Sequence, residues 1–262
     1  MDIDVRAHNR RAWNRQVEQG NPWTVPVSSA VVAAARQGQW ELYVTPTRPV
    51  PRAWFPALET CEVLCLASGG GQQGPILAAA GARVTVLDNS PAQLAQDRQV
   101  AERDSLEIHT VEGDMADLGA FAAGSFDLIV HPVSNCYTPD ARRVWLEAAR
   151  ILRPRGVLIA GFNNPALYIF DAMAMARGAL VVKHRLPYSD VDQLSEAQRQ
   201  VYITAGEPFE FSHTLEDQLG GQMAAGLVLT GLYEDRNGPE THHGLETYMP
   251  IYLATRAVKA VP

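Results

Sequence analysis

Short apolar runs alternate with helix-length segments through the middle of the chain. The runs comprise residues 63–67, 84–87, 108–111, 126–130 and 157–162, and are mostly apolar. The segments between them are 74–81, 91–103, 115–122 and 139–152. Strands that are apolar on both faces are typical of a parallel sheet covered by helices. The pattern therefore predicts an α/β fold with a doubly wound, mostly parallel sheet.

The C-terminal part of the chain predicts a different pairing. A helix at about 214–225 precedes two β-rich runs, 227–233 and 248–257. The linker between these runs, 234–247, is too short and too polar to hold a crossover helix. Parallel neighbours need such a crossover, so we expect the two runs to be antiparallel neighbours.

Two segments do not follow the strand–helix rhythm. Residues 1–55 are rich in tryptophan and proline; they predict helices at about 3–18 and 27–38, then a strap at 45–51, where prolines exclude a regular element. Residues 163–212 contain several prolines and aromatic residues. We therefore expect an N-terminal helical lid over 1–55 and a main domain over 56–262, with a cap inserted at about 163–212.

Composition and charge exclude several classes of protein. The 262 residues are 47% hydrophobic and carry a net charge of −7, which suits a globular protein and argues against a broad nucleic-acid surface. Cys61, Cys65 and Cys136 form no C-x-x-C pair, which excludes a disulfide scaffold and the usual zinc ribbon.

The sequence also carries an expectation about location and partners. The start at 1–4 is acidic where a signal peptide would be basic, and no stretch approaches the roughly 18 apolar residues of a membrane span. We expect a cytoplasmic monomer or homodimer that binds neither nucleic acid nor membrane.

A glycine-rich loop follows the first apolar run and opens a helix. Glycines let the backbone approach a ligand closely, and a helix N-terminus offers free N–H groups. Gly69, Gly71 and Gly74 match the dinucleotide fingerprint, and Asp88 ends the next strand, where a carboxylate can accept both ribose hydroxyls of an adenosine. The spacing alone is consistent with either a nicotinamide cofactor or S-adenosylmethionine.

Three further motifs follow in order. The third strand ends in Glu112-Gly113-Asp114-Met115, where an acid can bind an adenine amine or cap the following helix. The fourth strand begins Phe126-Asp127, and a Leu152-Arg153-Pro154-Arg155-Gly156 turn precedes the fifth. Together with the glycine loop and Asp88, the series resembles the class I S-adenosylmethionine-dependent methyltransferases over about residues 60–162, and the flanks resemble a bacterial subgroup of that family.

The resemblance implies a seven-stranded Rossmann-like fold with a reversed seventh strand. It also implies methyl transfer from S-adenosylmethionine, giving S-adenosylhomocysteine, and the lid and cap suggest a closed chamber for a small-molecule acceptor. The implied cofactor-binding residues are Ser68, Gly69, Gly70, Gly71, Gln72, Gln73, Asp88, Asn89, Ser90, Gly113, Asp114, Met115 and His131. Cys65 departs from the family, which usually has an acid at that position.

Two histidines are candidate catalytic residues. His131 ends the fourth strand beside the expected sulfonium, and an ordinary imidazole pKa near 6.5 suits a general base. His131 could equally be a structural residue of the cofactor pocket. His213 lies at the start of the late helix, either near the substrate entrance or as part of the helix cap.

Other functions remain as alternatives. One is an S-adenosylmethionine-binding module that associates with partners without catalysis. A second is an NAD(P)-dependent reductase, but none of the eight tyrosines is followed by the lysine of the short-chain Tyr-x-x-x-Lys pair. His242 and His243 suggest a metal pair only weakly, because adjacent residues on an extended chain point to opposite faces. We therefore predict no metal.

Overall fold

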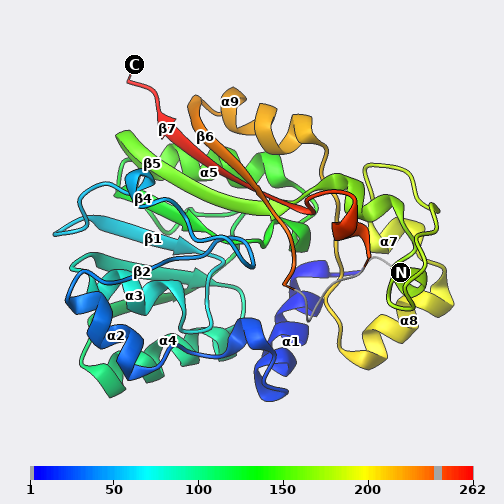
Figure 1. The fold of residues 1–262 in the computed structure, drawn as a ribbon, viewed down its shortest axis with the longest axis horizontal. Helices are drawn as coiled ribbons and strands as arrows, with labels where there is room; N and C mark the ends of the chain where they lie inside the picture. The colour runs from blue at the N-terminus through cyan, green and yellow to red at the C-terminus, as the bar shows by residue number, and fades with distance from the viewer. Residues whose placement is uncertain (1–2, 239–243, 262) are drawn as a thin grey trace.

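A seven-stranded sheet runs through the middle of the molecule in the computed structural model, which describes residues 3–238 and 244–261 (Figure 1). The strand order is β3-β2-β1-β4-β5-β7-β6. The strands are β1 (Glu62–Leu66), β2 (Arg83–Asp88), β3 (Ile108–Glu112), β4 (Phe126–His131), β5 (Leu152–Asn163), β6 (Leu227–Asp235) and β7 (Tyr252–Lys259). Strands β1 to β5 pair in parallel, whereas β7 is antiparallel to β5 and β6. The predicted doubly wound, mostly parallel sheet and the antiparallel last pair are confirmed.

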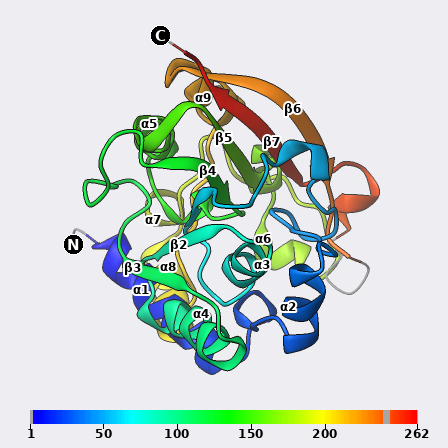
Figure 2. The same cartoon turned by 90° about the vertical axis from the view of Figure 1, so that its left-hand side faces the viewer.

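Helices cover both faces of the sheet, and Figure 2 shows them on its two sides. On one face α2 (Ser29–Arg36), α3 (Gln73–Ala79) and α4 (Pro91–Asp104) enclose one apolar cluster with alternate residues of β1, such as Val63. On the other face α5 (Ala141–Ile151), the π-helical turn η5 (Glu216–Gly220) and α9 (Gly221–Ala224) cover a second cluster that includes Leu64. Strand β1 is therefore buried on both faces, as its unbroken apolar run predicts.

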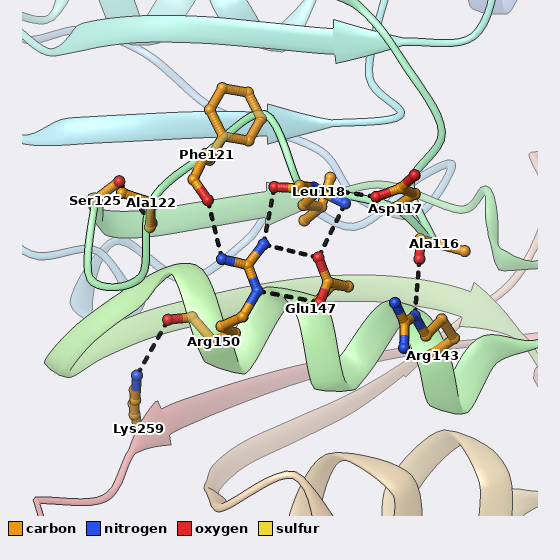
Figure 3. A network of polar contacts seen from close by, with 11 residues as sticks. Ala116, Asp117, Leu118, Phe121, Ala122, Ser125, Arg143, Glu147, Arg150 and Lys259 are labelled. Atoms are coloured by element: carbon orange, nitrogen blue, oxygen red, sulfur yellow. Dashed lines mark hydrogen bonds and ion pairs between the residues drawn. The ribbon is translucent and has the colours of Figure 1, made fainter.

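The segment at about 115–122, expected to be of helix length or a short helical turn, contains no helix. This segment forms turns, and side chains from α5 bind its backbone (Figure 3). Arg150 donates to the carbonyls of Leu118 at 2.8 Å and Phe121 at 2.9 Å, while Glu147 accepts the Leu118 N–H at 3.0 Å. Because these polar groups are already satisfied by side chains, the backbone needs no helical hydrogen bonds to bury Leu118.

The N-terminal segment folds as α1 (Val5–Glu18), then α2, then an extended strap across β5. Asp4 caps α1 by accepting the Ala7 N–H at 2.9 Å. The strap passes so close to β5 that a Cβ at Gly161 would lie 2.0 Å from the Val44 carbonyl oxygen. Glycine at position 161 is therefore required by this crossing.

The cap follows β5 and lies next to α1 beyond the carboxyl ends of the parallel strands (Figure 1). Asn9 of α1 accepts the Phe209 N–H at 2.8 Å and donates to the Phe209 carbonyl at 3.0 Å, so the N-terminal segment and the cap are joined directly. The cap helices are η4 (Pro165–Ile169), α6 (Ala172–Met175), α7 (Asp190–Gln193) and α8 (Glu196–Ala205). The remaining short 3-10 helices are η1 (Pro22–Thr24), η2 (Arg52–Trp54), η3 (Asn135–Tyr137) and η7 (Leu245–Thr247).

None of the helices in the described part of the chain has the length and apolar character needed to cross a membrane.

Candidate functional site

A cavity of about 950 Å³ lies where the carboxyl ends of β1, β2 and β4 meet α1 and the cap. Ligands of open α/β sheets bind at this edge, since the loops that follow the strands converge there. The strand-end residues Ala67, Asp88 and Pro132 line one part of the cavity, and Tyr168 and Glu210 line the other. The cavity therefore has a part beside the sheet and a part enclosed by the cap.

Eight of the thirteen expected cofactor residues line the cavity; these are Ser68, Gly69, Gln72, Gln73, Asp88, Asn89, Asp114 and Met115. The other five do not line it; these are Gly70, Gly71, Ser90, Gly113 and His131. Ser90 instead caps α4, accepting the Gln93 N–H at 3.1 Å, and Gly113 packs against Leu87. The sequence motifs thus contribute some residues to the cavity wall and others to the structure behind it.

Asp88 is the central polar residue of the part beside the sheet. One carboxylate oxygen accepts the Gly69 N–H at 2.9 Å and the other accepts the Ser90 N–H at 2.8 Å. A Cβ at position 69 would lie 2.6 Å from Cβ of Gln93, so only glycine fits between Asp88 and α4. Burial raises the pKa of Asp88 to about 6. An orientated carboxylate beside bare backbone fits the ribose and the main-chain contacts of an adenosine cofactor.

A second carboxylate, which the sequence interpretation missed, lies behind the glycine loop. Asp97 of α4 is 0% exposed, and the Gly70 N–H is shared between its Oδ2 and the Gln93 carbonyl, both at 3.1 Å. The other oxygen of Asp97 has no hydrogen-bond partner among the residues that the structure describes, and burial raises the pKa of Asp97 to about 7. Cys65, at the position of the family's acid, is buried close enough to Asp97 for the two to interact electrostatically.

The two glutamines of the loop hold the N-terminal segment. Gln72 donates from its amide to the carbonyls of Pro22 at 3.1 Å and Val25 at 3.0 Å. The amide of Gln73 donates to the Tyr43 carbonyl at 3.0 Å. Their side-chain nitrogens are therefore used within the protein, and the loop is tied to the segment that covers it.

Helix α1 closes the cavity near the ends of β2 and β3. Asn89 donates to the Arg6 carbonyl at 2.9 Å, and the Arg6 guanidinium lies 3.7 Å from the Asp114 carboxylate. Ser90 donates from its hydroxyl to Asn14 at 2.7 Å. The residues expected beside the adenosine are thus the residues that α1 contacts.

Both candidate catalytic histidines are enclosed in the protein and are not in the cavity wall. His131 is 0% exposed; Nδ1 donates to the Leu66 carbonyl at 2.8 Å, and Nε2 lies 2.7 Å from the Asn135 side chain. Burial lowers the pKa of His131. In His213, Nε2 is 3.0 Å from the carbonyls of Asn135 and Thr138. For both residues the geometry favours the structural interpretation over the general base.

The cap side of the cavity contains a carboxylate that the sequence did not indicate. The Tyr168 hydroxyl donates to Glu210 at 2.7 Å and accepts from Asn163 at 2.6 Å. Burial raises the pKa of Glu210 to about 7. Tyr168 and Glu210 are 42 residues apart in an aperiodic segment, so no spacing in the sequence brings them together.

Within the described part of the chain, no group of three or more His, Cys, Asp or Glu side chains is arranged so that it could hold a metal ion. His242 and His243 lie outside the described residues.

Comparison with known proteins decides the family. Residues 64–160 match the model of a methyltransferase domain. A protein from Bacillus subtilis, described as the uncharacterized methyltransferase YbaJ, is 51% identical over 97% of this chain and 98% of its own length. The chain belongs to the class I, S-adenosylmethionine-dependent methyltransferases. The nicotinamide alternative is thereby set aside, and the cofactor is S-adenosylmethionine, converted to S-adenosylhomocysteine.

Further similarities are more distant. A ubiquinone biosynthesis O-methyltransferase of Xanthomonas campestris is 29% identical over 53% of this methyltransferase and 60% of its own length. An S-adenosylmethionine-dependent methyltransferase of Mesorhizobium loti has a TM-score of 0.61 at 18% identity, covering 79% of this chain and 95% of that one. A second such structure, from Listeria monocytogenes, has a TM-score of 0.61 at 15% identity, covering 88% and 100%. At these identities the two structures are evidence for the fold alone.

Proposed function

We propose that this methyltransferase transfers the methyl group of S-adenosylmethionine to a small molecule held in the cap side of the cavity. The observation that carries the proposal is the continuity of one cavity of about 950 Å³ from Asp88 to Tyr168 and Glu210. This volume is at the upper end of ordinary ligand pockets and suits a nucleoside cofactor with a small acceptor. Coverage by α1 and the cap argues against a polymeric acceptor, which would need an open groove.

In this proposal Asp88 accepts the ribose hydroxyls, and Asp114 and Met115 flank the adenine. Ser68 and Gly69 contact the methionine part. Gly70, Gly71, Ser90 and Gly113 shape the loop and strand ends from behind.

The cofactor supplies an activated methyl group on its sulfonium, so the protein is required to align the acceptor and exclude water. Helix α1 and the cap perform the second task by covering the strand ends. Pro132 and Ser134 follow β4 and line the cavity at the end of this strand, where they are suited to limit the approach of the acceptor.

The cofactor site is tested by Asp88→Ala. Loss of hydrogen bonds to a charged acceptor weakens binding by about 1.5–3 kcal/mol, and titration of S-adenosylhomocysteine by calorimetry measures it. Glu102→Ala, on the exposed side of α4, is the control and should bind as the wild type does. Unchanged affinity in Asp88→Ala would remove Asp88 from the ribose.

Catalysis itself is tested by turnover. The wild-type enzyme with S-adenosylmethionine and a panel of hydroxyl, thiol and amine compounds should release S-adenosylhomocysteine with at least one acceptor. Cofactor binding without turnover on small molecules, together with methylation of a protein or nucleic acid, would contradict the proposal. The panel also separates catalysis from the association module, which binds cofactor and transfers nothing.

A further inference from the structure

The cavity is lined by more acidic than basic groups. Among its described lining residues are six carboxylates, Asp88, Asp114, Asp171, Asp190, Glu207 and Glu210. Its lysine and arginine side chains are Lys183 and Arg6. Both cations already have acidic partners, since Lys183 lies 2.5 Å from Asp171 and Arg6 lies 3.7 Å from Asp114. An anionic acceptor would therefore enter a cavity without a cation to receive it.

Glu210 is the carboxylate that is best placed to bind an acceptor. Tyr168 donates to one of its oxygens at 2.7 Å, whereas the other oxygen accepts no hydrogen bond from any residue that the structure describes. The neighbouring Asp190 differs, because both of its oxygens are used: Tyr188 donates to one at 2.7 Å and the Glu210 N–H to the other at 2.6 Å. Glu210 thus presents a free oxygen to the cavity.

The acidic neighbours of Glu210 make its ionised form less favourable unless a cation is bound nearby. Asp190 and Glu207 are the acidic groups that act on it, and both act with burial to raise its pKa. A carboxylate removed from water is unfavourable unless a cation or donors compensate it. Within the protein that compensation comes from the Tyr168 hydroxyl.

Aromatic rings line the same cavity as this carboxylate. Tyr168 and Tyr188 stack with ring centroids 5.7 Å apart, and Trp13 meets Tyr137 edge-on at 5.2 Å. All four residues line the cavity. The electron-rich faces of such rings attract cations, most strongly where water is excluded. Aromatic rings with a free carboxylate are a combination that recognises ammonium groups.

We propose that the acceptor carries a positively charged amino group and that Glu210 is the specificity residue that binds it. This inference rests on the proposed function, because it names the class of molecule that the cap side of the cavity holds. The proposal concerns the amino group as the group that Glu210 binds, and it does not specify which atom receives the methyl group.

The test uses three probes of similar shape and different charge, namely phenethylamine, 2-phenylethanol and phenylacetate. Each is titrated by calorimetry into the wild-type enzyme saturated with S-adenosylhomocysteine. We expect phenethylamine to bind about tenfold more tightly than the alcohol, and phenylacetate to bind most weakly. Glu210→Gln should abolish the preference for the amine while keeping S-adenosylhomocysteine affinity. Glu196→Gln, whose side chain is 81% exposed on α8, is the matched control and should keep the preference.

A second measurement needs no variant. Between pH 6 and 8 the affinity of phenethylamine should rise about tenfold as Glu210 ionises, while that of 2-phenylethanol stays constant. Burial keeps the pKa of the cysteine and tyrosines that face Glu210 above the ordinary values, so these groups stay neutral there. The facing groups are Asp190, Glu207, Cys136, Tyr137, Tyr168, Tyr188, Tyr202 and Tyr252.

Three results would overturn the inference. In the first, the amine binds no more tightly than the other probes, and in the second its preference survives Glu210→Gln. The third result is that no probe binds at a concentration 20-fold above ~1 mM, the Kd of a weak ligand. In each case S-adenosylhomocysteine still binds, and the proposed function stands. Loss of S-adenosylhomocysteine binding by the wild type would instead remove the proposed function.

Discussion

The carboxyl groups of half-buried Asp88 and buried Asp97 meet at the glycine loop, and their titration should govern how stability depends on pH. Burial raises the pKa of Asp88 to about 6 and that of Asp97 to about 7. The ordinary aspartate value near 4 applies to the unfolded chain, so between about pH 4 and pH 7 the folded protein binds more protons. The stabilisation that comes from protonating these two groups is complete below about pH 4. It is lost as the pH rises through about 6 for Asp88 and about 7 for Asp97.

Replacing Asp97 by asparagine should flatten this dependence. Asparagine keeps an oxygen for the Gly70 N–H but does not titrate. Wild-type stability should fall by at most about 1.4 kcal/mol per pH unit for each such group, and Asp97→Asn should remove one group's share. Urea unfolding at pH 5, 6, 7 and 8 measures the slopes.

Asp117→Asn is the control for this prediction. Asp117 is in the β3–β4 connection and accepts the Gly119 N–H at 3.1 Å near the surface. The Asp117→Asn variant should keep the wild-type dependence of the unfolding free energy on pH. If Asp97→Asn also keeps it, the pH dependence does not come from Asp97.

The two acids also show what single residues reveal in a sequence. Asp88 could be predicted because it ends an apolar strand at a fixed interval from the glycines. Asp97 could not, because it is in a helix among polar residues such as Gln96 and Arg98 and has the appearance of a surface residue. The one sign of its burial is that it lies one helical turn after Gln93, which is also buried.

At the scale of elements, the β3–β4 connection depends on α5 for its shape. Arg150→Met should destabilise the protein by about 2–3 kcal/mol, because the Phe121 carbonyl loses its donor, the Leu118 carbonyl loses one of its two donors, and Glu147 loses its cationic partner. The free energy of urea unfolding measures the effect.

Arg83→Met is the matched control for Arg150. The Arg83 side chain is 68% exposed and pairs with Glu62 at 3.0 Å, so we expect a loss below about 1 kcal/mol. Equal losses in the two variants would show that the connection does not depend on Arg150.

A second element-scale prediction concerns the irregular start of β5, where its pairing with β4 shifts register. Arg155 has φ of 65°, in the left-handed region that favours glycine. Arg155→Gly should stabilise the protein by about 1 kcal/mol, since a Cβ is unfavourable there. Thermal unfolding tests this, and Arg155→Ala, which keeps the Cβ, should give no such gain.

At the scale of the whole molecule, the cofactor side of the cavity is closed where α1 meets the cap. Asn9→Ala removes three hydrogen bonds, two to Phe209 and one to the Tyr137 carbonyl. We expect S-adenosylhomocysteine to dissociate about tenfold faster, the kinetic equivalent of about 1.4 kcal/mol. Stopped-flow measurement tests this, and Gln19→Ala, at the exposed end of α1, should dissociate as the wild type does.

The sheet could be predicted from the sequence and the cap could not, for a physical reason. Buried parallel strands need continuous apolar runs, and those runs are visible locally, as at 63–67 and 157–162. The cap is held by pairs distant in sequence, such as Tyr168 with Glu210 and Asn9 with Phe209. The cap side of the cavity therefore emerged only from the structure, whereas many residues of the wall beside the sheet could be predicted from the motifs.

The strap across β5 has a consequence for the order in which the protein is made. Val44 lies on Gly161, and the backbone of Thr47 donates to Asp235 at 2.8 Å. A ribosome adds roughly 5–20 residues per second, so Thr47 emerges on the order of ten seconds or more before Asp235 exists. During that interval Thr47 lacks its carboxylate partner. The strap is therefore synthesised early but completes its contacts late.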